Sequence, residues 1–474
     1  MKKITYQRIL LLLLIVFAFS NCSKTESIPA DVKINNFVWK GLNAYYLWQK
    51  DVANLSDVRF SSQNQLNNFL RGYDSPKDLF QSLLNQPGVV DRFSWIVDDY
   101  VALENSFQGL SLNNGMEFGL KGVTGSTTDI FGYVRYVIPN SDATTQGVLR
   151  GMIFNQVGGT QLTRSNYRSL LFSSSTNYTI HLADYNNGNP TSNGNTISLT
   201  KSQLQENPVA IAKVFDIDAS NKVGYLLYNQ FASSFDRQLN TAFSTFNGIT
   251  DLIVDLRYNP GGSVRTASFL GSMITGQFDG QTFSKQVWND KVMEATNDPS
   301  RFINTFTSHI TGQNDLINSL QLTRIYFIVT GSSASASELV INSLKPYIDV
   351  KLVGNTTYGK HVGSVTLYDS DNYTRNGANL NPDHTWAMQP IVLEIKNVDN
   401  QNAPQGFTPE VALAEDYGNL GILGELTEPM LARTITYITT GARMSKTTDK
   451  TTFKEVSNSK LESITGNNMY VELQ

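Results

Sequence analysis

The sequence predicts a multidomain α/β protein with a helical N-terminal segment and a β-rich middle. Three observations predict this class. The chain has 474 residues, which is too long for one compact core. Short β-like runs separated by Gly, Asn and Ser fill residues 109–199. From residue 211 onward, continuous apolar runs typical of buried strands lead through glycine-containing turns into helix-like stretches.

The first residues have the pattern of a secretory leader. An apolar run from Ile9 to Phe19 follows basic residues and is too short to span a bilayer comfortably. Cys22, the single cysteine, comes next at the place where bacterial lipoproteins are cleaved and acylated, although Asn21 departs from the usual small residue before it. We therefore expect a signal peptide over residues 1–21, lipidation at Cys22 and export to the cell envelope. The alternative is an ordinary leader with an incidental cysteine.

The charge of the chain is mildly acidic. The formal net charge is −4, and it becomes −7 once the leader takes away its basic residues, Lys2, Lys3 and Arg8. Nucleic-acid binding demands a basic face, so a nucleic-acid partner is not expected.

Helices are predicted in the region that follows the leader. One apolar face is formed by residues at three- and four-residue spacings, namely Val38, Leu42, Tyr45 and Trp48. A second helix is predicted from Pro76 to Leu84, with Ser75 at its cap position. We expect a small helical bundle in a domain of residues 22–104, which also holds the lipid anchor and a linker. No residue there has an obvious chemical role.

The middle of the chain, residues 105–204, is predicted to be a β-rich domain. A strand over Gly132–Pro139 is followed by a short helix, a second strand, a helix and a third strand, and the Asn- and Gly-rich stretch 185–196 is predicted as a loop. This order resembles a PDZ domain, which binds chain ends by adding them as an extra strand. The resemblance implies that GMEFGL holds a peptide carboxylate, through Gly115, Met116, Glu117, Phe118, Gly119 and Leu120. The alternative is a generic small β-rich module.

A serine-rich turn is the first candidate for chemistry. In GSSASASELVINSLKPY (331–347), a strand turns through small residues into a helix. Small side chains let a substrate approach the backbone, and the N–H groups and positive dipole end of a helix start favour a developing oxyanion. A Ser/Ala run by itself is more often a flexible loop.

A lysine supplies the second candidate, because a serine hydroxyl needs a base. Lys360 ends GNTTYGK, and the 25 positions from Ser335 leave room for one helix and one strand. A lysine serves as a base when burial disfavours its ammonium form. The chain has four histidines, His181, His309, His361 and His384, of which only His361 adjoins this lysine. An isolated lysine would be a solvated surface charge.

A glycine-rich turn supplies the third candidate. DLRYNPGG (255–262) follows an apolar run, and its two glycines would expose backbone N–H groups with little steric hindrance. An oxyanion hole could be formed by Gly261, Gly262 and Ala336. Taken alone, NPGG is an ordinary turn.

Together and in this order, DLRYNPGG, SASASE and YGK resemble the C-terminal processing, or tail-specific, serine proteases of family S41. The resemblance covers residues 109–395 and implies a PDZ-like domain ahead of a crotonase/ClpP-like α/β protease core, here residues 205–430. It implies Ser335 as nucleophile, Lys360 as general base, and mainly structural roles for Asp255, Arg257 and Asn259. A polar C-terminal extension, residues 431–474, follows the core.

Two further motifs refine the resemblance. DRFSW (91–95) and GFTPE (406–410) look like those of lipoprotein members from Bacteroidetes-type bacteria. Many family members also have a glutamine that orients the lysine, and Ser364 stands in its place here. We expect Ser364, His361 or another side chain to orient Lys360, or turnover to be slow.

The sequence thus predicts a serine endopeptidase of the cell envelope, at the outer membrane, that cleaves proteins near their C-termini through an acyl-enzyme. Its expected partners are protein or peptide substrates and a membrane. No metal or organic cofactor is expected, because the sequence has no HExxH or Walker motif. One alternative is a catalytically weak or inactive peptide-binding lipoprotein that retains the protease scaffold. A second is a crotonase-fold enzyme acting on acyl thioesters.

Overall fold

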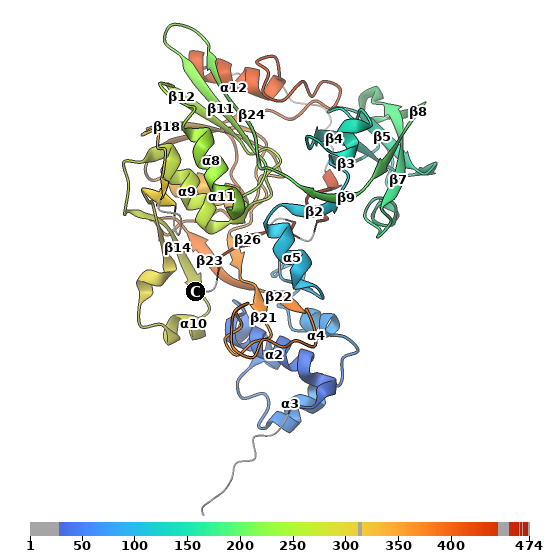
Figure 1. Ribbon diagram of the computed structural model, residues 1–474, viewed down its shortest axis with the longest axis vertical. Coiled ribbons are helices and arrows are strands. Elements are labelled where there is room, and N and C mark those ends of the chain that lie inside the picture. Colours follow the sequence, from blue (N-terminus) through green and yellow to red (C-terminus); the bar gives the residue numbers. More distant parts are fainter. Residues whose placement is uncertain (1–27, 311–314, 444–454, 464, 467, 473–474) are drawn as a thin grey trace, which may run out of the picture.

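The computed structural model describes residues 28–310, 315–443, 455–463, 465–466 and 468–472 (Figure 1). The predicted leader and Cys22 lie outside the described residues, so both stay predictions. Within the described ranges, no helix is long and apolar enough to cross a membrane.

The helical N-terminal segment is confirmed. Its elements are η1 (Ala30–Val32), α2 (Lys33–Tyr45), η2 (Gln49–Asp51), η3 (Ala53–Leu55), α3 (Gln63–Leu70), α4 (Pro76–Ser82) and α5 (Tyr100–Phe107). As predicted, α4 begins at Pro76, and the N–H of Asp78 donates to the hydroxyl of Ser75 at 3.1 Å. Val38 and Leu42 of α2 are fully buried and share the main apolar core with Val392. The apolar face of α2 therefore packs in the same cluster as residues of the α/β core.

Residues 116–200 form a β-rich module with an apolar core of its own, at the right of Figure 1. Its antiparallel sheet has the order β25-β3-β4-β5-β7-β8. The elements are β3 (Met116–Gly122), β4 (Ile130–Val137), α6 (Asp142–Thr145), β5 (Ile153–Val157), β6 (Thr160–Gln161), α7 (Tyr167–Leu171), β7 (Asn177–Asp184), η4 (Asn186–Gly188), β8 (Thr191–Thr200) and β25 (Glu455–Asn458). The loop predicted over 185–196 is wrong from Thr191 onward, because the backbone of this polar stretch pairs with β7. Strand β25 comes from the C-terminal end of the chain.

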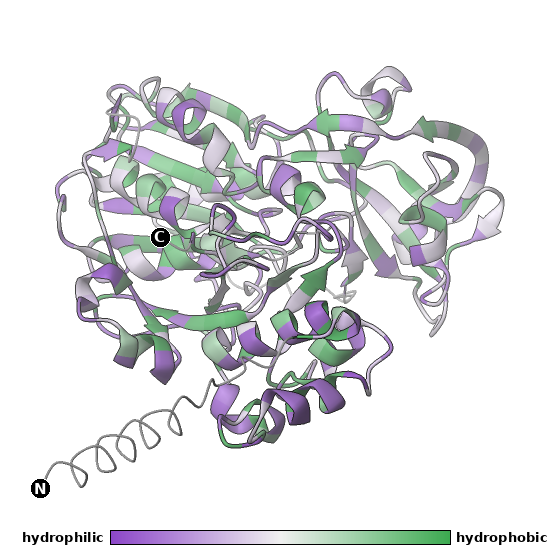
Figure 2. Ribbon diagram, turned by 60° about the horizontal axis from the view of Figure 1, so that its bottom comes forward, coloured by the Kyte–Doolittle hydropathy of each residue, from purple (hydrophilic) through white to green (hydrophobic). Residues whose placement is uncertain are grey.

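The largest part of the molecule is an α/β core around a sheet of the order β10-β11-β12-β18-β19-β24. Neighbours from β11 to β24 are parallel, and β10 is an antiparallel edge. The strands are β10 (Val209–Asp216), β11 (Lys222–Tyr228), β12 (Asp251–Asp255), β18 (Arg324–Val329), β19 (Asp349–Gly354) and β24 (Val411–Ala412). Figure 2 shows hydrophobic residues along these strands, as expected for a sheet that is covered on both faces.

Helices cover both faces of this sheet. Leu252 and Val254 of β12 pack with the helices of one face, whereas Ile253 packs with α12 on the other, which is the alternation expected of a strand. The helices are η5 (Ser233–Phe235), α8 (Asp236–Phe243), α9 (Val264–Thr275) and α11 (Ala336–Leu344) on the first face and α12 (Pro429–Thr440) on the second. Helix α12 crosses residue 430, where the core was expected to end, and its Leu431 and Tyr437 belong to the same apolar cluster as Ile253 of β12.

A second mixed sheet lies beside the first, with the order β13-β26-β20-β23-β14-β15. Its strands are β13 (Gly262–Ser263), β14 (Thr282–Trp288), β15 (Ile303–Thr305), β20 (Val362–Ser364), β23 (Ile391–Lys396) and β26 (Met469–Tyr470). The remaining elements are β1 (Trp95–Val97), β21 (Leu367–Tyr368), β22 (Ala387–Gln389), β2 (Leu110–Asn113), β9 (Ser202–Gln205), α10 (Asp290–Ala295), η6 (Pro299–Phe302), β16 (His309–Ile310) and β17 (Asp315–Leu316). Strand β1 pairs with β22 and joins the N-terminal segment to the core.

A buried ion network holds the end of β12. Arg257 is fully buried and donates to Asp255 and to Glu428 at the start of α12, with distances of 2.7–3.0 Å. Burial alone would raise the pKa of Glu428, but the charge of Arg257 brings it below its ordinary value. Asn259 donates to the carbonyl of Tyr228 at 2.9 Å. These contacts agree with the structural roles expected for Asp255, Arg257 and Asn259.

Replacing Arg257 with methionine is expected to lower the free energy of unfolding by about 3–5 kcal/mol, because Asp255 and Glu428 would stay buried without their cation. The midpoint of urea unfolding measures the effect. Arg71→Met is the matched control, since its ion pair with Asp31 is exposed and contributes little to stability. Equal midpoints for the two variants would contradict the prediction.

Candidate active site

Ser335 lies on a sharp turn between β18 and α11. It has φ 64° and ψ −114°, a conformation that is costly for a residue other than glycine and that the surrounding structure must hold in place. Its side chain is fully buried, and its Oγ has no hydrogen-bond partner among the described residues. The turn therefore places an unpaired hydroxyl at the N-terminal end of a helix, where the dipole favours negative charge.

Lys360 lies on the connection between β19 and β20, and its side chain is only 2% exposed. Burial lowers its pKa to about 7, against the opposing charges of Asp91 and Glu338. Ser335 and Lys360 line the same small pocket. The structure thus brings the two predicted residues together, with an amine that is largely uncharged slightly above neutral pH.

Glu338 connects the turn that contains Ser335 to the loop that contains Lys360. Its carboxylate accepts hydrogen bonds from the backbone N–H groups of Ser335 (2.9 Å), Gly359 (2.7 Å) and Lys360 (2.9 Å), and from the Thr357 hydroxyl (2.5 Å). Burial raises the pKa of Glu338, and these hydrogen bonds oppose the rise. Glu338 was not among the residues predicted to contribute to the site. It closes the SASASE motif and stands at the third position of α11, where a side chain can reach back to the residue before the helix.

The N-terminal segment contributes directly to the surroundings of Lys360. The Nζ atom of Lys360 lies 4.8 Å from the ring centroid of Phe93. Buried Asp91 is held by the Tyr46 hydroxyl (2.7 Å) and by the N–H groups of Phe93 and Ser94. Asp91 and Phe93 both belong to the DRFSW motif. The sequence indicated no obvious chemical role for any residue of this segment, and the structure places Phe93 against the Lys360 amine.

The glycine-rich turn lies against Ser335, as expected. A Cβ atom placed on Gly261 would come within 3 Å of the Cβ of Ser335 and the nitrogen of Ala336, so only glycine fits. The N–H of Gly261, however, donates to the side chain of Asn259 at 2.9 Å. Of the three expected oxyanion donors, Gly261 is thus already engaged, and Gly262 and Ala336 remain candidates.

Ser364 and His361, the two residues expected to orient Lys360, have different surroundings. The Ser364 hydroxyl donates toward the side chain of Asn468 (3.0 Å) and the carbonyl of Met469 (3.2 Å), so its proton is directed to the C-terminal end of the chain. His361 lines the pocket with Lys360. Burial lowers the pKa of His361, and its Nδ1 has no hydrogen-bond partner among the described residues. A neutral imidazole is therefore available beside the lysine.

The predicted peptide-binding residues lie apart from this pocket, in and just before β3 of the β-rich module. Gly115 has φ 88° and donates its N–H to Asn113, while residues 116–120 form the strand. The module contacts the loop before the nucleophile, because Arg135 of β4 donates to the hydroxyl of Ser332 at 2.8 Å.

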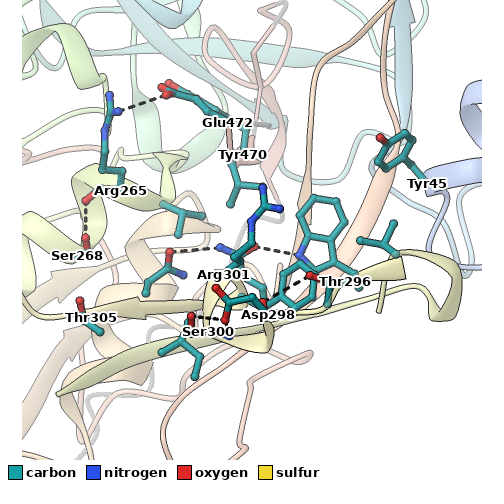
Figure 3. Close-up of a pocket in the computed structure, with 18 of the residues that line it drawn as sticks. Tyr45, Arg265, Ser268, Thr296, Asp298, Ser300, Arg301, Thr305, Tyr470 and Glu472 are labelled. Carbon is teal, nitrogen blue, oxygen red and sulfur yellow. Dashed lines mark hydrogen bonds and ion pairs between the residues drawn. The ribbon is translucent and has the colours of Figure 1, made fainter. Parts of the chain in front are cut away.

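A larger pocket of about 1040 Å³ is shown in Figure 3. Tyr45 comes from α2, Arg265 and Ser268 come from α9, and Arg301 comes from η6. Ser335 and Lys360 do not line this pocket, but Ser263 of β13 does. The larger pocket therefore provides open space next to β13, the strand at the end of the glycine-rich turn.

Two family models match the sequence. Residues 222–389 match "Peptidase family S41", and residues 33–95 match "Peptidase S41 N-terminal domain". The chain belongs to peptidase family S41.

Relatives with curated descriptions match over part of their length. The "Probable CtpA-like serine protease" of Staphylococcus aureus (strain N315) is 29% identical over 156 residues, which are 32% of this chain and 28% of that protein. The protein of the same name from Staphylococcus epidermidis (strain ATCC 12228 / FDA PCI 1200) is 26% identical over 187 residues, 38% of this chain and 35% of that protein. The matches span only about a third of the length of these relatives.

Solved structures show the same fold over most of the chain. The "Putative S41 protease" from Bacteroides fragilis NCTC 9343 has a TM-score of 0.63 at 22% identity, covering 85% of this chain and 96% of that one. The "Photosystem II D1 C-terminal processing protease" has a TM-score of 0.50 at 18% identity, covering 86% and 97%. The predicted multidomain α/β fold is confirmed.

Glu338→Gln is expected to lower the free energy of unfolding by about 3 kcal/mol, because an NH2 group would face backbone N–H donors in a buried position. Urea unfolding measures the loss, and hydrogen exchange of the Gly359 and Lys360 amides should quicken. Glu394→Gln is the matched control, since this glutamate is partly exposed beside Lys396. Unchanged hydrogen exchange at both amides would rule out a stabilising role for their hydrogen bonds to Glu338.

Proposed function

We propose that the chain is a serine endopeptidase in which Ser335 is the nucleophile and Lys360 the general base. One observation supports this most: a buried amine with a pKa of about 7 lines the same pocket as a buried serine hydroxyl that has no hydrogen-bond partner among the described residues. A hydroxyl becomes a nucleophile when an adjacent base can take its proton, and a desolvated lysine is such a base near neutral pH.

The proposed reaction forms and hydrolyses an acyl-enzyme. Neutral Lys360 takes the proton of Ser335 as the oxygen attacks the scissile carbonyl carbon. The N–H groups of Gly262 and Ala336 stabilise the negative charge on the carbonyl oxygen. Lys360 then gives its proton to the leaving amine of the substrate. The side-chain amine of Lys360, again neutral, later takes a proton from the water that releases the acyl group.

The substrates we propose are protein tails. The edge of β3 is suited to an extended polypeptide, because strand addition holds a ligand through its backbone and is tolerant of its side chains. Cleavage near C-termini, a PDZ-like role of the β-rich module and lipid anchoring at Cys22 in the cell envelope belong to the same proposal. The leader pattern and the family resemblance support them.

Ser335→Ala should abolish cleavage of an unfolded protein such as reduced casein, with a loss of about 10³-fold or more, because no other group can form the acyl-enzyme. Gel electrophoresis and mass spectrometry follow the products. Ser343→Ala is the matched control, since Ser343 is also buried with no hydrogen-bond partner among the described residues but lies further along α11. Equal, absent cleavage by the parent and Ser335→Ala would favour the non-catalytic peptide-binding alternative.

The pH dependence of kcat/KM tests the base. Lys360 acts in its deprotonated form, and burial lowers its pKa to about 7, so kcat/KM should rise with pH through about 7 and then level off. Lys360→Arg should be inactive from pH 5 to pH 9, because a guanidinium stays protonated throughout. A rise centred near the ordinary lysine pKa, about 10.4, would contradict the assignment.

A further inference from the structure

The C-terminal segment, meaning the described residues 455–463, 465–466 and 468–472, adds a strand to the β-rich module. Strand β25 pairs antiparallel with β3, aligning Glu455 with Lys121. Beyond β25, the N–H of Ser459 donates to the carbonyl of Phe118 (3.0 Å), and the N–H of Phe118 donates to the hydroxyl of Ser459 (3.0 Å). Strand addition at an open edge is a general way of binding an extended peptide. The edge proposed for substrates is therefore occupied by the chain itself.

Side chains of the segment reach across to α7. Val456 packs against the apolar core of the module. Glu462 accepts from the hydroxyl of Tyr167 (2.9 Å) and from the guanidinium of Arg168 (2.9 Å). The segment runs along β3 toward the turn at Gly115, which is the direction a bound peptide would take to bring its C-terminal end to that turn.

The same segment then enters the candidate active site. Strand β26 lies between β13 and β20 and is parallel to both. Strand β13 contains Gly262, and β20 begins two residues after Lys360. A strand between these two occupies the position where an extended substrate would lie beside the nucleophile.

The backbone of the segment touches the proposed machinery. A Cβ atom placed on Gly261 would lie within 3 Å of the carbonyl oxygen of Asn468, the Cβ of Ser335 and the nitrogen of Ala336. Met469 lines the small pocket. Glu472 pairs with Arg265 at 3.2 Å at the rim of the larger pocket (Figure 3). The carbonyl oxygen of Asn468 and the Cβ of Ser335 thus both lie against Gly261.

We propose that the C-terminal segment is an internal ligand that occupies the edge of β3 and the cleft beside Ser335, and that substrates must displace it. This inference rests on the proposed function and adds a regulation of the same site. With the C-terminal segment in place, Ser335 and Lys360 are almost inaccessible to solvent, because Ser335 is fully buried and Lys360 is 2% exposed. One polypeptide fills both the recognition edge and the cleavage position, so its release opens both together.

Two variants of the full-length protein weaken the docking of the segment without altering the module. Val456→Asp puts a charge against the apolar core of the module, and Ser459→Pro removes the N–H that bonds to Phe118. Val89→Asp is the matched control, because Val89 is 73% exposed and belongs to the N-terminal segment, outside the β-rich module. Circular dichroism checks that each variant is folded.

The first readout is hydrogen exchange in residues 116–122, which does not depend on catalysis and can be measured in a Ser335→Ala background. We expect protection in the parent and faster exchange, by at least tenfold, in both docking variants. The second readout is the initial rate of cleavage of reduced casein by the active forms. We expect each docking variant to be at least fivefold faster than the parent and than Val89→Asp.

The outcomes separate the two proposals. Rapid exchange of β3 in the parent would show that the segment is not docked and would overturn the inference. Lost protection with an unchanged or lower rate would show that the segment does not block the site, which also overturns it. Absence of cleavage by every form, together with protection that depends on Val456 and Ser459, would overturn the proposed function while supporting the internal ligand.

Discussion

The carboxylate of Glu338 accepts hydrogen bonds from the backbone of both Ser335 and Lys360, and the rest of the site depends on this interaction. Burying a carboxylate is costly, and hydrogen bonds to a charged group recover about 1.5–3 kcal/mol each. Because the donors come from two segments separated by α11 and β19, the carboxylate fixes their distance. It also braces the positive φ of Ser335, which would otherwise relax.

The lowered pKa of Lys360 depends on a second constraint, which is the exclusion of water from its amine. Its amine lies over Phe93 of the N-terminal segment, and Met469 of the C-terminal segment lines the same pocket. Residues distant in the sequence therefore set the pKa of one amine. The charges of Asp91 and Glu338 limit how far that pKa falls, so desolvation and nearby charge together leave it near 7.

The elements close in sequence were predictable and the long-range contacts were not. The strand, the small residues and the helix around Ser335 follow from local pattern, and the shared pocket with Lys360 follows from the spacing of one helix and one strand. Phe93 lies in a stretch without periodicity, so nothing local indicates that it reaches the lysine. Strands β25 and β26 form because their backbone pairs with strands from distant segments, and such short runs carry little local signal for that pairing. The bond from Gly261 to Asn259 likewise depends on the folded turn.

The position of Phe93 has a consequence for where the molecule can work. The same N-terminal segment that follows the predicted lipid attachment point also shields the amine of Lys360. A core shorn of that segment would keep its serine, but water would reach the amine and restore its proton. Under the proposed function, membrane attachment and the protonation state of Lys360 would therefore depend on the same stretch of chain, and proteolysis within that stretch would release a fragment whose Lys360 amine is charged.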